Sequence, residues 1–163
     1  MKSETLKWIV YNLVVCFAVY WLSNLVLWYP WSINEKLGQI LMLTVNPLFW
    51  GFASYICIIS YPKANSMNGV LLTSLIFVLE AIGSDFVFFV VIRNAINKLL
   101  QSTTFYSWGF VLLLPFIVYL LFRKRIKKNK KTVEISDFWK PLIIGLLSFV
   151  IIVIILVFNI IFE

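Results

Sequence analysis

Hydrophobic residues fill five long stretches of this chain, and short polar segments separate them. Each stretch approaches or exceeds the roughly 20 apolar residues that a helix needs to cross a bilayer. Since lipid offers the backbone no hydrogen-bond partner, such stretches fold as helices whose amides pair internally. The sequence therefore predicts an all-α polytopic membrane bundle, forming one transmembrane domain over residues 1–163, with helices at about 8–29, 37–60, 70–92, 104–122 and 141–162.

The overall composition agrees with this reading of the pattern. Of 163 residues, 62% are hydrophobic and only 13% are charged. A soluble domain of this length has too small an interior to bury so much apolar surface. Frequent Lys, Ile and Asn are typical of an AT-rich bacterial source, so we expect a multi-pass protein of a bacterial cell (plasma) membrane.

The distribution of charge predicts the orientation. Fourteen basic residues stand against seven acidic ones, a net charge of +7. A predicted loop at 123–140 follows the fourth helix, and in this position a basic run indicates a cytoplasmic anchor that contacts anionic lipid, rather than nucleic acid. With that loop inside, 11 of the 14 basic residues are cytoplasmic, which predicts N-in and C-out. The residues of the basic run are Arg123, Lys124, Arg125, Lys127, Lys128, Lys130 and Lys131.

Two carboxylates, Glu80 and Asp85, interrupt the third apolar stretch. A charged side chain inside a membrane costs at least a few kcal/mol, and it often marks a functional site. At 100° per residue, Thr73 and Ser84 share a polar arc with the two acids, which lie on its opposite edges. We therefore expect each acid to contact a different neighbouring helix. For Asp85, a salt bridge to Arg93 is an equal alternative to a functional role.

The first two predicted helices carry polar residues that can meet this arc. Asn46 precedes Pro47 in the second helix, at about the depth of Glu80. Tyr20 belongs to a stripe of the first helix that also includes Asn12 and Cys16. We predict a ligand- or proton-binding site, with simple helix packing as the alternative for the polar stripes. Its residues are Glu80, Asp85, Asn46, Ser84, Thr73 and Tyr20.

The residue types present argue against enzymatic chemistry. The chain has no histidine, and Cys16 and Cys57 form no CxxC motif. Only one other aspartate exists, Asp137, and it lies in the predicted cytoplasmic loop, so an aspartyl dyad with Asp85 is not expected. We therefore predict no enzyme activity, no metal site and no cofactor.

Two hypotheses for function remain after these exclusions. The first is a small transporter or ligand-binding protein, in which Glu80 exchanges a proton for a cationic ligand. The expected ligand is a hydrophobic or cationic small molecule. The second is a non-catalytic accessory or regulatory subunit, whose acids pair with Arg or Lys of another membrane protein. Because the chain is short, we expect a homodimer or a partner membrane subunit, and no nucleic acid partner.

Overall fold

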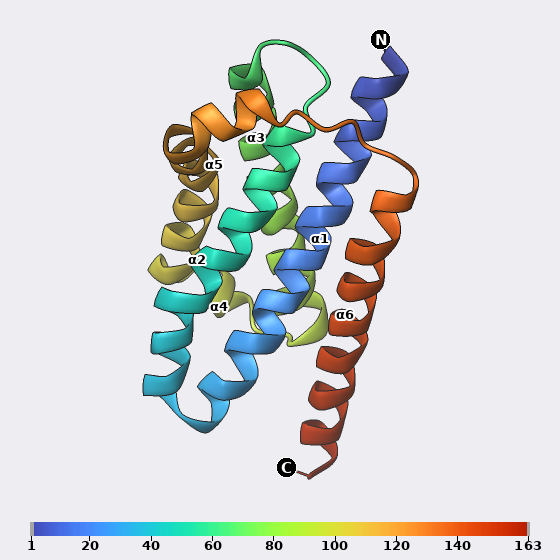
Figure 1. The fold of residues 1–163 in the computed structure, drawn as a ribbon. Helices are drawn as coiled ribbons and strands as arrows, with labels where there is room; N and C mark the ends of the chain where they lie inside the picture. The colour runs from blue at the N-terminus through green and yellow to red at the C-terminus, as the bar shows by residue number, and fades with distance from the viewer. Residues whose placement is uncertain (1, 163) are drawn as a thin grey trace.

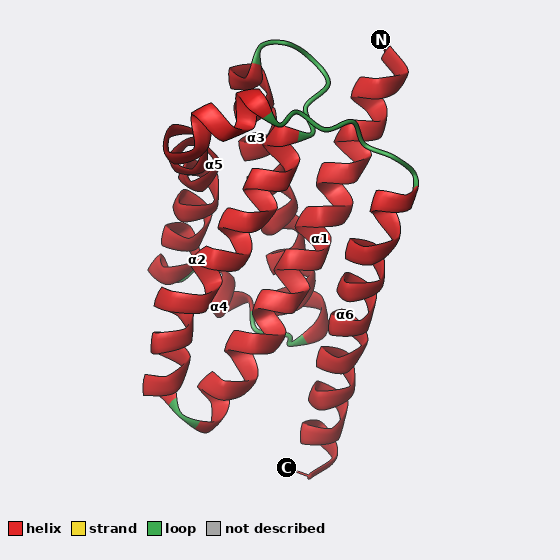
Figure 2. Cartoon of the chain, viewed as in Figure 1, coloured by secondary structure: helices red, strands yellow, loops and turns green. Residues whose placement is uncertain are grey.

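A computed structural model describes residues 2–162, with all side chains in that range except those of residues 2, 28, 29, 31, 32 and 159–162. The described chain consists of helices and loops, without strands (Figure 2). Five helical spans are long and apolar enough to cross a membrane, which confirms the predicted all-helical class and the number of such helices. The elements are α1 (Lys2–Ile33), α2 (Glu35–Ile59), α3 (Ser66–Asp85), the π-helix η1 (Phe86–Ile92), α4 (Ile96–Leu99), α5 (Ser102–Lys128) and α6 (Ser136–Phe162).

The long helices extend beyond most of their predicted ends. Only Asn34 separates α1 from α2, and its side chain caps α2 by accepting a hydrogen bond from the amide of Leu37 at 3.3 Å. The predicted loop at 123–140 is wrong over much of its length, because α5 continues to Lys128 and α6 begins at Ser136. Lys and Arg are good helix formers and favour a helix C-terminus, so the basic run prolongs α5 instead of ending it.

The helices are arranged with α1 between two groups of neighbours (Figure 1). One side of α1 packs against α2 and α3, and these two helices pack in turn against α5. The other side packs against α6, which lies at the edge of the bundle (Figure 1). Gly145 allows this close approach, since a Cβ there would stand 2.5 Å from the ring of Phe17 and 3.0 Å from the backbone of Ala18.

The two ends of the bundle differ in charge. The N-terminus, the α2–α3 loop and the α5–α6 linker lie together at one end, which we call the basic end (Figure 1). The turn at Asn34, α4 and the last turns of α6 lie at the opposite end, which we call the far end (Figure 1). Eleven of the fourteen basic residues belong to segments at the basic end.

Tight packing is concentrated near the basic end. Trp8 is fully buried, its ring meets Tyr61 edge-on at 4.9 Å, and its indole N–H donates to the carbonyl of Cys57 at 2.8 Å. Toward the far end, α2 buries only Gly38 in its stretch from residue 35 to 49, and η1 buries only Phe88. The core is therefore densest in the half of the bundle next to the basic end, and it continues through Trp21 and Phe88 toward the far end.

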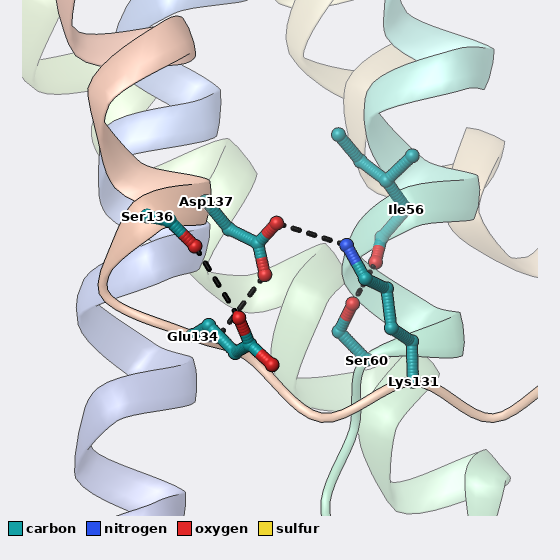
Figure 3. Close-up of polar contacts among 6 residues, drawn as sticks. All are labelled: Ile56, Ser60, Lys131, Glu134, Ser136 and Asp137. Atoms are coloured by element: carbon teal, nitrogen blue, oxygen red, sulfur yellow. Dashed lines mark hydrogen bonds and ion pairs between the residues drawn. The ribbon is translucent and has the colours of Figure 1, made fainter.

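The linker at 129–135 crosses the basic end and holds α6 to the bundle (Figure 3). The amide of Lys131 donates to the carbonyl of Ile59 at 3.1 Å, and its ammonium pairs with Asp137 at 2.9 Å. Asp137 also accepts from the amide of Glu134 at 3.0 Å. The Lys130 ammonium donates to the carbonyl of Lys63. Two of the seven residues of the basic run are thus engaged in contacts within the protein.

Candidate functional site

A polar stripe runs along the face of α1 that meets α2 and α3. It consists of Trp8, Asn12, Cys16 and Tyr20, which follow one another at four-residue spacing. All four side chains are buried, and each forms a hydrogen bond to a neighbouring helix. The stripe predicted on the first helix therefore faces the acid-bearing helix α3, and it organises the polar contacts of the bundle.

In the tightly packed half, Asn12 of this stripe links Thr73 and Trp8 through two hydrogen bonds. The hydroxyl of Thr73 donates to the side-chain oxygen of Asn12 at 3.0 Å. The side-chain amide of Asn12 donates to the carbonyl of Trp8 at 2.9 Å. Thr73 and Asn12 are both completely buried. Thr73, a predicted site residue, thus lies in a satisfied packing contact that joins α1 to α3.

Glu80 lies further along α3 and has an unpaired carboxyl oxygen. Its carboxyl group lies near the thiol of Cys16, which donates to the carbonyl of Phe77 at 3.8 Å. The carboxyl oxygen Oε2 is buried and has no hydrogen-bond partner. The residue as a whole is half-buried, and Oε2 lies in the interior of the bundle.

Asn46 presents a second unpartnered oxygen at a similar depth. The rings of Trp50 and Phe77 meet at 5.8 Å and so align α2 with α3. Asn46 lies one turn beyond Trp50, and Glu80 lies one turn beyond Phe77, both toward the far end, because the two helices are antiparallel. The side-chain oxygen of Asn46 is buried without a partner. This arrangement agrees with the common depth that was predicted for Asn46 and Glu80.

Asp85, by contrast, has both oxygens occupied. The hydroxyl of Tyr20 donates to Oδ1 at 2.6 Å, and the indole N–H of Trp108 donates to Oδ2 at 2.6 Å. These contacts join α1, α3 and α5. Asp85 is also the last residue of α3 before the π-helix η1, a rare geometry that is frequent at functional sites.

One expectation about Asp85 is corrected by these contacts. Asp85 takes Tyr20 and Trp108 as partners instead of Arg93, whose guanidinium lies 5.7 Å from the ring centre of Phe88. Asp85 thus contacts both α1 and α5, while Glu80 lies near Cys16 of α1.

Four further residues lie on the helices around the two acids. Ser84 is half-buried beside Asp85, on the same helix as Glu80. On α1, the indole nitrogen of Trp21 and the hydroxyl oxygen of Ser23 are buried without partners. The sequence analysis did not include Trp108 in the site. The only feature of the sequence that could have indicated it is its indole N–H, a hydrogen-bond donor in the fourth predicted helix.

The described residues include no group of three or more His, Cys, Asp or Glu side chains that could hold a metal ion. The chemistry available is therefore that of single carboxyl groups, amide and hydroxyl oxygens, and aromatic rings. Comparisons with protein-family models, with curated proteins and with solved structures found no match to this chain.

Proposed function

We propose that this chain is a multi-pass protein of a bacterial plasma membrane, with its basic end in the cytoplasm and its C-terminus outside. The five long apolar helices support membrane insertion. The concentration of 11 of 14 basic residues at one end supports this orientation, because Lys and Arg are retained on the cytoplasmic side.

Within this membrane protein, Glu80 serves as a proton- or cation-responsive site of a small transporter or ligand-binding protein. The observation that carries the proposal is the buried oxygen Oε2 of Glu80, which has no hydrogen-bond partner. Leaving such an acceptor unpaired costs about 1–3 kcal/mol, and more if it is charged. A proton on the carboxyl group, or a cationic ligand beside it, removes this cost.

The surroundings of Glu80 favour an organic cation or a hydrophobic molecule as ligand. Asn46 adds a second oxygen that lacks a donor. Nearer the far end, Tyr20, Trp21 and Phe88 form edge-to-face ring contacts at 5.1 and 6.2 Å. Aromatic faces attract cations, so a cationic ligand that reached these buried rings would gain apolar and cation–π contacts.

The proposal is tested by thermal unfolding of the purified protein in detergent, scanned over about pH 5 to 9 against a panel of organic cations. Wild type is compared with Glu80→Gln, and with Glu35→Gln as a control that removes an exposed carboxylate at the far end. We expect pH-dependent stabilisation by a cation in wild type and in the control, and none in Glu80→Gln. Equal curves for all three proteins would contradict a ligand site at Glu80.

A second candidate function is an accessory subunit that docks through α3. Gly83 supports it, because no atom lies within 4 Å of the position a Cβ would take, and the residue is exposed beside Glu80. Small residues on a membrane helix allow another helix to approach closely. Co-purification of a stoichiometric second membrane subunit, lost on Gly83→Leu, would favour this function. A second copy of this chain in the same place would instead indicate a homodimer.

A further inference from the structure

The last two turns of α5 present a fixed basic surface. Arg123, Lys124 and Arg125, followed by Lys127 and Lys128, are helical and exposed. Between them, Ile126 is fully buried against a cluster that includes Ile58, Val70 and Tyr119. This anchor holds the helix against the bundle, so the five cations have set positions around the solvent side of α5.

This basic surface has no acidic partner within the described part of the protein. The ion pairs there are Lys7 with Glu4 and Lys131 with Asp137. Lys130, the remaining residue of the basic run, donates to backbone carbonyls in the α2–α3 loop. The sequence pattern contains seven basic residues, and the fold leaves the five on α5 without an acidic partner or a side-chain hydrogen bond to the protein, among the described residues.

Apolar and basic side chains meet at this point on α5. Six consecutive residues of the helix form the exposed surface there. The first half, Leu120, Leu121 and Phe122, is exposed and apolar, and the second half is Arg123, Lys124 and Arg125. A phospholipid is complementary to this surface along its length, because its acyl chains match the apolar residues and its anionic phosphate matches the basic ones.

We propose that this surface binds anionic phospholipid of the cytoplasmic leaflet, with acyl chains on Leu120 and Leu121 and the headgroup on Arg123, Lys124 and Arg125. Each juxtamembrane Lys or Arg is attracted to an anionic membrane surface, and the attraction decays within a Debye length. The proposal rests on the cytoplasmic orientation of the basic end proposed above. It is independent of the function assigned to Glu80, because the two sites share no residue.

The experiment compares thermal unfolding of the protein in neutral detergent with added phosphatidylglycerol or phosphatidylcholine. We expect phosphatidylglycerol to raise the Tm of wild type by about 2–4 °C more than phosphatidylcholine does. The triple variant Arg123→Gln, Lys124→Gln and Arg125→Gln should lose this difference. The double variant Lys130→Gln and Lys131→Gln is the matched control, since it removes basic residues that are engaged internally; its Tm should fall in both lipids while the difference between lipids stays.

Several outcomes would overturn the proposal. Equal stabilisation of wild type by the two lipids would do so, as would a preference for phosphatidylglycerol that survives in the triple variant. An equal Tm increase with millimolar inorganic phosphate would assign the surface to a free anion instead of a lipid. If only the double variant lost the preference for phosphatidylglycerol, the lipid would contact the linker and not α5.

Discussion

The two halves of the bundle treat their polar side chains differently. Next to the basic end, Asn12 and Thr73 pair with each other, and Ser74 donates to the carbonyl of Leu112. From the middle of the bundle to the far end, Asp85 is paired with Tyr20 and Trp108. Buried polar atoms of Trp21, Ser23, Asn46 and Glu80 in the same part lack partners among the described residues. Ser66, at the start of α3, is an exception at the basic end.

This contrast places most of the unpaired buried polar atoms in the part of the molecule that includes Glu80. Buried polar groups that are fully paired make a region rigid and specific, whereas unpaired groups carry a cost that a new partner can relieve. Glu80 lies at the boundary between the two halves, near Cys16 on α1, and its oxygen Oε2 is buried without a partner. The far half also buries fewer side chains, which lowers its local stability.

The largest effect is expected from Trp8→Ala in the tightly packed half. The substitution removes a fully buried ring and its hydrogen bond to Cys57, so the free energy of unfolding should fall by about 3–5 kcal/mol. The control is Phe86→Ala in the far half, where the ring is 51% exposed, with an expected change within about 0.5 kcal/mol. Unfolding by SDS in mixed micelles measures both, and similar losses would contradict the division into halves.

The next effect concerns Asp85, which ties the far half together. Asp85→Ala leaves the hydroxyl of Tyr20 and the indole N–H of Trp108 without their acceptor, so we expect a loss of about 2–3 kcal/mol. Asp85→Asn keeps an acceptor oxygen and should lose less than the alanine variant. The same unfolding assay distinguishes them. If both variants are as stable as wild type, Asp85 does not join the three helices.

The smallest change in the free energy of unfolding is expected when a buried hydroxyl is removed, and it should be larger for a paired hydroxyl than for an unpaired one. Thr73→Val removes the donor to Asn12 and should cost about 1 kcal/mol. Ser23→Ala removes a buried hydroxyl that has no partner, so its free energy of unfolding should change by no more than about 0.5 kcal/mol. Matched chemical denaturation of the two variants tests this order. A larger loss in Ser23→Ala would mean that Ser23 has a partner in the membrane.

Much of the architecture follows from the apolar pattern, because a bilayer leaves helices as the only way to pair the backbone of each stretch. The stripe containing Asn12, Cys16 and Tyr20 was also recognisable, since side chains four residues apart share a helix face. Its contact with Thr73 and Asp85 bears out the expectation that the polar faces of the first and third helices meet.

The details that escaped prediction depend on how separate helices are rotated against each other. The contact between Trp108 and Asp85 joins helices α5 and α3, and no periodicity within either helix specifies it. Arg93 was a reasonable partner for Asp85 on a regular helix, but the π-helix between them changes the rotation per residue. The end of α5 was misplaced because charge was taken as a loop signal, although Lys and Arg are good helix formers.

The position of α6 has a consequence for how the protein is made. One face of α1 packs against α2 and α3, and Phe17 and Trp21 pack against α6. The ring of Trp21 contacts that of Phe149 in α6 at 4.6 Å. Roughly 130 residues separate these two rings in the chain, which at about 5–20 residues per second is roughly 6–26 s of synthesis. During that interval the face of α1 that carries Phe17 and Trp21 has no contact with α6. The surface of α1 is therefore completed only when α6 has been made.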